Sequence, residues 1–154
     1  MPNGTMHKPA STSITYSPRS FCVHEFETLR VLCEAIIPAD RESGGAIEAG
    51  VPEWIDLLAS QNKDYQLQLI AGLDWLDTVC VELYGGSYLA CISRQQQEIL
   101  TLIAFRINGQ NDPRLIPGIE FFSMLRKDTV VAFFATEVGR KYLGFSYPNV
   151  ERIM

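Results

Sequence analysis

Apolar residues recur every three or four positions along most of the chain, which is the spacing of one face of an α-helix. Over residues 24–36 this stripe includes Phe26, Leu29 and Cys33, and Pro38 ends the helix because the residue before a proline avoids helical geometry. No stretch shows strand-like alternation and no segment repeats. The pattern therefore predicts an all-α, single-domain bundle of about five helices.

Turn and capping residues predict where the other helices begin and end. Pro52 suits the first turn of one helix, and Asp64 is expected to cap a longer helix over residues 65–84. Gly85 is expected to end that helix. The long helix should face the core with Leu69, Leu73, Leu76, Cys80 and Leu83.

Two further helices are expected in the second half of the chain. Ser93 and Gln96 have the spacing of a capping box, in which each side chain bonds to a backbone N–H at a helix start. The last long helix should end at Gly139, and its residues 119–138 carry apolar side chains nearly all round. Such a helix either is central in its own bundle or is clamped between the bundle and a partner.

Length and composition set the domain organisation. With 154 residues, the chain is expected to form one domain over residues 21–154, preceded by a flexible arm at residues 1–20 that is polar and rich in Pro, Ser and Thr. That arm has no apolar core of a signal peptide and no twin-arginine pair. No apolar run approaches the roughly 20 residues that a membrane-spanning helix needs.

The net charge of the chain limits the kinds of partner that it can bind. The net charge is −5, which argues against nucleic acid and against an anionic membrane surface, because both require a basic face. Hydrophobic residues make up 47% of the chain, which suggests apolar surface that a protein partner could cover.

The sequence offers little for catalysis or metal binding. His24, Glu27 and Glu34 share one helix face, but a di-iron bundle needs Glu-x-x-His on two helices, and this chain has none. His24 is also the only histidine outside the arm, and no nucleophile elbow, phosphate loop or dinucleotide fingerprint occurs. We therefore expect no catalytic residue, cofactor site or metal site in this chain.

The four cysteines leave three interpretations open. None lies in a Cys-x-x-Cys motif. The cysteines can be ordinary buried thiols, they can form one or more disulfides, or they can bind a metal. Cys80 and Cys91 can meet only if a turn folds the chain back between them, since eleven residues of continuous helix would separate them by about 16 Å.

Five segments in order carry a resemblance to a known family. They are AIIPAD at 35–40, GGAIEAGVPEWIDLL at 44–58, GLDWLD at 72–77, FFSMLRKDT at 121–129 and GRKYLGFSYPN at 139–149. Over residues 26–149 the chain resembles the gluconate 2-dehydrogenase subunit 3 family, the small subunits of membrane-linked sugar dehydrogenases.

The resemblance implies a helical, non-catalytic accessory subunit. Such a subunit binds and stabilises or matures a large flavoprotein of the glucose–methanol–choline type, which holds FAD and oxidises a sugar or polyol, and electrons pass on to a cytochrome c subunit. The match suggests a scaffold corner at residues 38–51 and a set of partner-interface candidates. These candidates are Pro38, Asp40, Phe121, Phe122, Arg126, Phe134, Phe145 and Tyr147.

Two other functions stay open from the sequence. One is a freestanding helical binding or regulatory module, including a homo-oligomer, and the other is a chain that lends side chains to a partner's substrate pocket. Many family members carry a twin-arginine leader, which this sequence lacks. The expected location is the cytoplasm, or the periplasm if a leader was removed or the partner carries the signal.

Overall fold

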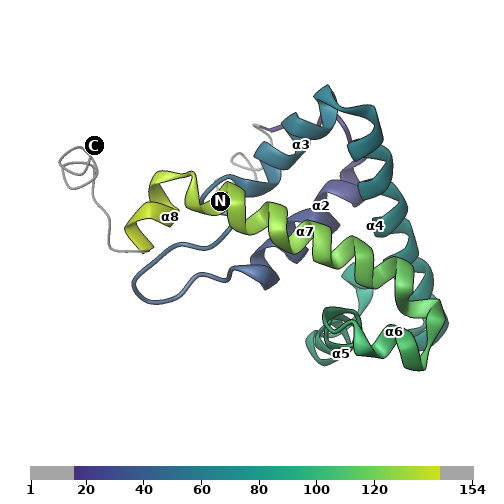
Figure 1. The fold of residues 1–154 in the computed structure, drawn as a ribbon. Helices are drawn as coiled ribbons and strands as arrows, with labels where there is room; N and C mark the ends of the chain where they lie inside the picture. Colours follow the sequence, from purple (N-terminus) through teal and green to yellow (C-terminus); the bar gives the residue numbers. More distant parts are fainter. Residues whose placement is uncertain (1–15, 143–154) are drawn as a thin grey trace, which may run out of the picture.

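The computed structural model describes residues 16–142, and all regular secondary structure in this range is helical (Figure 1). The predicted all-α bundle of about five helices is confirmed. The long helices are α2 (Val23–Ile36), α3 (Val51–Gln61), α4 (Lys63–Tyr84), α5 (Ser93–Ala104) and α7 (Ile116–Phe134). The short elements are α6 (Ile107–Asn111), α8 (Glu137–Tyr142) and the 3-10 turns η2 (Tyr88–Ala90) and η3 (Pro113–Leu115).

Helix α7 is the central element. It packs against α2, α3, α4 and α5, and Figure 1 shows it running across the molecule from the α5–α6 end to α8. Phe121, Leu125 and Phe133 are buried along it, whereas Val131 is 67% exposed. Helix α7 is thus central in its own bundle, the first of the two alternatives, and it also keeps an exposed apolar edge.

The observed helix starts agree only in part with those predicted from the sequence. Gly50 is in the left-handed region (φ 81°) directly before α3, and Pro52 occupies the first turn as predicted. The cap of α4 is Asn62, whose Oδ1 accepts from Tyr65 N at 3.1 Å, so the prediction of Asp64 was wrong by two residues. Asp64 instead places its negative charge in the first helical turn, where the helix dipole favours it.

The prediction that Ser93 and Gln96 form a capping box at the start of α5 was wrong by one residue. The helix begins at Ser93 itself, and Gln95 Oε1 accepts from the N–H of Ile92, the cap residue, at 3.1 Å. Gln96 takes no part in the cap, and its side-chain Nε2 donates to the carbonyl of Tyr88 at 2.8 Å.

Of the two predicted helix ends, the end of α4 is confirmed and the end of α7 was wrong. Gly85 ends α4 in the left-handed region (φ 87°), as predicted. Helix α7, however, ends at Phe134 rather than at Gly139, and Thr136 Oγ1 accepts from Gly139 N at 3.1 Å to start α8. A Cβ on Gly139 would lie 2.0 Å from the Phe133 carbonyl oxygen, so the glycine allows α8 to fold closely back on α7.

The core includes most of the predicted face of α4. Leu69, Leu73, Leu76 and Cys80 are buried, but Leu83 is 54% exposed. Leu83 lies in the last turn before Gly85, where the neighbouring Tyr84 packs against the core in its place. The expectation that Leu83 faces the core was therefore wrong.

Residues 16–20, assigned from the sequence to the arm, pack against α3. Asp56 has no exposed surface, and its carboxylate accepts from the Tyr16 hydroxyl, from Arg19 N at 2.9 Å and from Ser20 N at 2.8 Å. Residues 1–15 and 143–154 lie outside the described range. None of the helices within the described range is long and apolar enough to cross a membrane.

Candidate partner interface

An open groove lies between α2 and α5 and is floored by α7. It has a volume of about 600 Å³. Its lining is apolar or neutral except for Glu34. The lining side chains come from α2 (Val31, Glu34, Ala35), the corner (Ile47), η2 (Tyr88), α5 (Ser93, Gln96, Gln97, Leu100, Thr101, Ala104), the residue after it (Phe105) and α7 (Phe122).

The floor of the groove carries an aromatic–cation pair. Phe122 is 6% exposed, and the guanidinium carbon of Arg126, one turn further along α7, lies 5.4 Å from its ring centroid. A guanidinium at this distance from an aromatic face is attracted by the ring quadrupole. The exposed Arg126 therefore places a positive charge beside a mostly apolar groove.

Phe121, the neighbouring candidate, lies on the other side of α7. Its ring packs on Gly72 of α4, where a Cβ would come within 2.0 Å of Phe121 Cδ1. Phe121 is 5% exposed and belongs to the core between α4 and α7. The two adjacent phenylalanines, which the sequence grouped together, thus face different elements.

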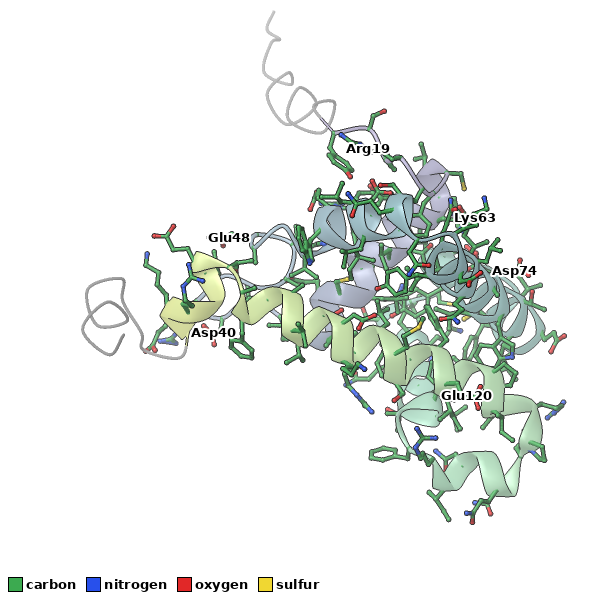
Figure 2. All side chains as sticks on the ribbon, turned by 45° about the horizontal axis from the view of Figure 1, so that its top comes forward. Arg19, Asp40, Glu48, Lys63, Asp74 and Glu120 are labelled. Atoms are coloured by element: carbon green, nitrogen blue, oxygen red, sulfur yellow. The ribbon has the colours of Figure 1, made fainter. Side chains whose placement is uncertain are left out.

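The corner at residues 38–51 borders the groove at one edge. Pro38 and Asp40 are exposed, and Asp40 Oδ1 accepts from Glu42 N at 2.9 Å and Ser43 N at 2.8 Å. Asp40 therefore caps the amides of its own loop. Figure 2 shows Asp40 at the end of the molecule that carries α8, away from Glu120.

Glu34 fastens this corner to α2. Its carboxylate accepts from Ala39 N at 2.9 Å and from Ile47 N at 3.0 Å. Both of its oxygens are therefore occupied by backbone donors, and the single charged side chain in the groove lining serves the scaffold. The sequence had placed Glu34 only on a helix face with His24 and Glu27.

That helix face does not assemble a metal site. His24 Nε2 lies 2.6 Å from Asp77 Oδ2 on α4, and Glu27 pairs with Arg30 at 2.8 Å. Each of the three side chains thus has a different partner. Among residues 16–142, no group of three or more histidine, cysteine or acidic side chains is placed to hold a metal ion.

A chain of hydrogen bonds supports the η2 wall of the groove. Asp77 Oδ1 accepts from Tyr88 N at 2.9 Å, and the Tyr88 carbonyl accepts from the Gln96 side chain at 2.8 Å. Burial is the main cause that raises the pKa of the Tyr88 hydroxyl, so this side chain stays neutral at physiological pH. The wall is therefore rigid and uncharged.

The remaining candidates lie away from the groove or outside the described range. Phe134 is half-buried at the end of α7, with its ring edge-to-face on Phe133 at a centroid distance of 5.1 Å. Phe145 and Tyr147 fall within residues 143–154, which lie outside the described residues.

Exposed apolar side chains gather at the end of the molecule beside the groove. They lie on the last turns of α4, on α5 and α6, and at the start of α7, which meet at one end in Figure 1. We call this set the α5–α6 apolar end: Val81, Leu83, Ile92, Leu102, Phe105, Ile107 and Ile116, each at least 37% exposed. Phe105 belongs to both the groove and this end, so the two surfaces are continuous.

Sequence reasoning missed the groove and Asp56. A signal for Asp56 existed: Pro52, Ile55, Asp56 and Ala59 form the buried stripe of α3, and an acidic residue on such a stripe requires donors. No comparable signal marked the groove, because its walls come from segments about 65 residues apart.

The comparison with protein families decides which family these features belong to. The family model for gluconate 2-dehydrogenase subunit 3 matches residues 23–150, which includes every described helix. The chain belongs to the gluconate 2-dehydrogenase subunit 3 family. No curated protein and no solved structure matches this subunit 3 chain.

Proposed function

We propose that this chain is the non-catalytic accessory subunit of a flavin-dependent sugar or polyol dehydrogenase. It binds and stabilises or matures a large subunit of the glucose–methanol–choline type, which holds the FAD, and a cytochrome c subunit takes up the electrons. The observation that carries this proposal is the family match over residues 23–150, since the family is named as a dehydrogenase subunit.

The surface of the chain supports a role in protein binding. The groove between α2 and α5 continues into the α5–α6 apolar end, so a long apolar surface is open to solvent. Exposed apolar surface of this extent is typical of protein interfaces. A groove between two helices accepts an apolar helix or strand of a partner, with a total buried area on the order of 1,600 Å² for a stable complex.

Recovery of the native complex tests the proposal. The tagged chain is captured from its native extract, and the eluate is analysed by absorbance spectroscopy and mass spectrometry. A yellow eluate with a flavoprotein several times the mass of this chain is the expected result. A colourless eluate that contains this chain alone, or only copies of it, would contradict the proposal and favour a freestanding module.

A pair of variants then tests the groove as the contact surface. Ala35 is exposed on α2 and lines the groove, so Ala35→Arg introduces a long charged side chain without disturbing the core. We expect at least a tenfold loss of affinity for the flavoprotein, because a buried unpaired charge opposes apolar contact. Ala71→Arg, the same change at an exposed position of α4 ten residues before Val81, is the matched control and should bind as the wild type does.

A further inference from the structure

The end of α4 and the segment after it form a tight reversal. Gly85 turns the chain in the left-handed region, and η2 then runs back beside α4 before α5 begins at Ser93. This reversal is the turn that two cysteines eleven residues apart, Cys80 and Cys91, require in order to meet.

Backbone and side-chain hydrogen bonds fix the position of the returning segment. Asp77 Oδ1 accepts from Tyr88 N at 2.9 Å, which attaches η2 to α4. Asp77 and Cys80 lie three residues apart, and therefore on the same face of α4. Cys91 N donates to the carbonyl of Tyr88 at 3.2 Å and closes the turn, so Cys91 is returned to the face that carries Cys80.

The two thiols are neighbours. Both are free, Cys91 packs against the buried cluster that includes Cys80, and its proximity is one of the causes that raise the pKa of Cys80. Cys80 has no exposed surface, whereas Cys91 is half-buried and its Sγ lies 3.8 Å from the Gly86 carbonyl oxygen. The pair therefore joins one protected sulfur to one that solvent can reach.

The other two cysteines have different surroundings. Cys22 is exposed at the start of α2, where its Sγ accepts from Glu25 N at 3.5 Å. Cys33 is buried, and its Sγ accepts from the Thr129 hydroxyl at 3.6 Å. Within the described residues, the partners of these two thiols are thus a backbone N–H and a hydroxyl.

We propose that Cys80 and Cys91 are a disulfide-forming site, oxidised by low-molecular-weight disulfides such as glutathione disulfide. The Cys91 thiolate attacks one sulfur of the oxidant, the S–S bond of the oxidant breaks, and one glutathione thiolate leaves. The Cys80 thiolate then attacks Cys91 Sγ and expels the second glutathione. The protein loses two electrons and two protons, and the oxidant gains both as two thiols.

The environment of each sulfur sets the order of these steps. Of this pair, Cys91 is the one that an oxidant can reach, so the mixed disulfide forms there. Burial, followed by the proximity of Cys91, raises the pKa of Cys80 to about 12, so its thiolate is scarce near neutral pH. The second step therefore accelerates as pH rises.

The bond would fix one wall of the groove. It would tie the end of α4 to Cys91, two residues before α5 begins, and Tyr88 and Ser93 on either side of Cys91 both line the groove. Oxidation should therefore hold α5 more firmly in its place. The inference does not depend on which partner the groove binds.

Peptide mass spectrometry of the full-length reduced chain tests the proposal. The chain is incubated with excess glutathione disulfide at pH 8, quenched in acid, alkylated with iodoacetamide in denaturant and digested with trypsin. Residues 64–94 form one tryptic peptide that contains both cysteines. We expect this peptide to be unalkylated and about 2 Da lighter than its reduced form, with the loss reversed by dithiothreitol.

A thermal melt gives an independent readout. Closing a loop of this length should raise Tm by about 5–10 °C, and the rise should disappear on reduction. Cys22→Ser, the matched control at an exposed thiol, should show the same mass loss and the same rise. Cys91→Ser should show neither.

Three results would overturn the proposal. The first is a stable glutathione adduct on Cys91 with Cys80 still alkylated. The second is full alkylation of both cysteines after excess oxidant, and the third is a bridge that joins either of them to Cys22 or Cys33. The wild-type chain alone decides among these, so a variant that folds poorly does not affect the outcome.

Discussion

Asp56 is a buried carboxylate that determines how the chain enters the bundle. It sits on the inner stripe of α3 and accepts hydrogen bonds from Tyr16, Arg19 N and Ser20 N, while Ser20 Oγ donates to the Asp56 carbonyl at 2.9 Å. A buried carboxylate is tolerated only when donors replace its lost hydration. Residues 16–20 are thereby held on α3 by polar contacts.

Replacing this carboxylate should destabilise the fold. Asp56→Asn keeps the shape but turns one acceptor oxygen into a donor NH₂, which cannot serve Tyr16 and the two backbone N–H groups together. We expect a loss of about 2 kcal/mol in the free energy of unfolding, measured by urea denaturation. Asp74→Asn, at an exposed position of α4 (labelled in Figure 2), should change it by less than about 0.5 kcal/mol. Equal effects of the two substitutions would refute this account of Asp56.

The contact between Gly72 and Phe121 gives a second prediction for single residues. A Cβ at position 72 would lie 2.0 Å from Phe121 Cδ1, so Gly72→Ala forces the ring or the helix to move. Overpacking of this kind lowers the free energy of unfolding by roughly 1–3 kcal/mol, and the better helix propensity of alanine returns only about 1 kcal/mol. We therefore expect Gly72→Ala to be destabilising overall.

A double-mutant cycle with Phe121→Leu checks that the ring is the cause. Because leucine vacates part of the ring volume, Gly72→Ala should cost at least about 1 kcal/mol less in the Phe121→Leu background than in the wild type. The measurement is again urea unfolding of the four proteins. Strict additivity would mean that the ring does not limit position 72.

Among the elements, helix existence was predictable and helix boundaries were not. The apolar stripes of α2 and α4 identify these helices in the sequence, because burial repeats with the helical period, whereas α7 is apolar nearly all round. Capping was misassigned at α4 and α5, where Asn62 and Gln95 act instead of Asp64 and Gln96. Several neighbouring polar residues can cap equally well in isolation, and tertiary contacts such as Gln96 with Tyr88 decide which of them is used.

The contact between α4 and α7 should make stability depend on alkaline pH. Tyr65 OH donates to Asp128 Oδ2 at 2.7 Å, and burial, followed by this bond, raises the pKa of Tyr65 above its ordinary value of 10.0. Above that value the unfolded chain releases the phenolic proton and the folded chain keeps it. The unfolded state then binds fewer protons, so the free energy of unfolding falls as pH rises.

Tyr65→Phe isolates this contribution. The variant should be about 1 kcal/mol less stable than the wild type near pH 8, because the hydrogen bond is lost. Its stability should then fall less steeply above pH about 10. Some slope will remain, since the pKa values of Tyr16 and Tyr88 are raised too. Parallel curves for the two proteins in urea titrations across this range would exclude Tyr65 as a source of the slope.

At the scale of the whole molecule, the sequence predicted the bundle, left two positions open for α7 and did not predict the groove. Val31, Leu100 and Phe122 line it from three helices, and nothing in their local patterns distinguishes them from core residues. A concavity arises where helices diverge, and the packing of the whole bundle determines that divergence. The family resemblance selected Phe122 and Arg126, which lie at the groove, together with Phe121, which lies in the core.

Hydrogen exchange on the free chain and on its complex would map the partner surface across the whole molecule. If the groove is the contact surface, amides of α5 and of the second half of α2 should exchange more slowly in the complex, because binding suppresses local opening of the segments it covers. Amides at the α3–α4 junction, residues 61–64, lie outside the groove lining and should exchange at unchanged rates. The junction is an internal control, since a general gain in stability would slow both regions. Protection at the junction without protection of α5 would place the partner on the opposite part of the bundle and leave the groove with another role.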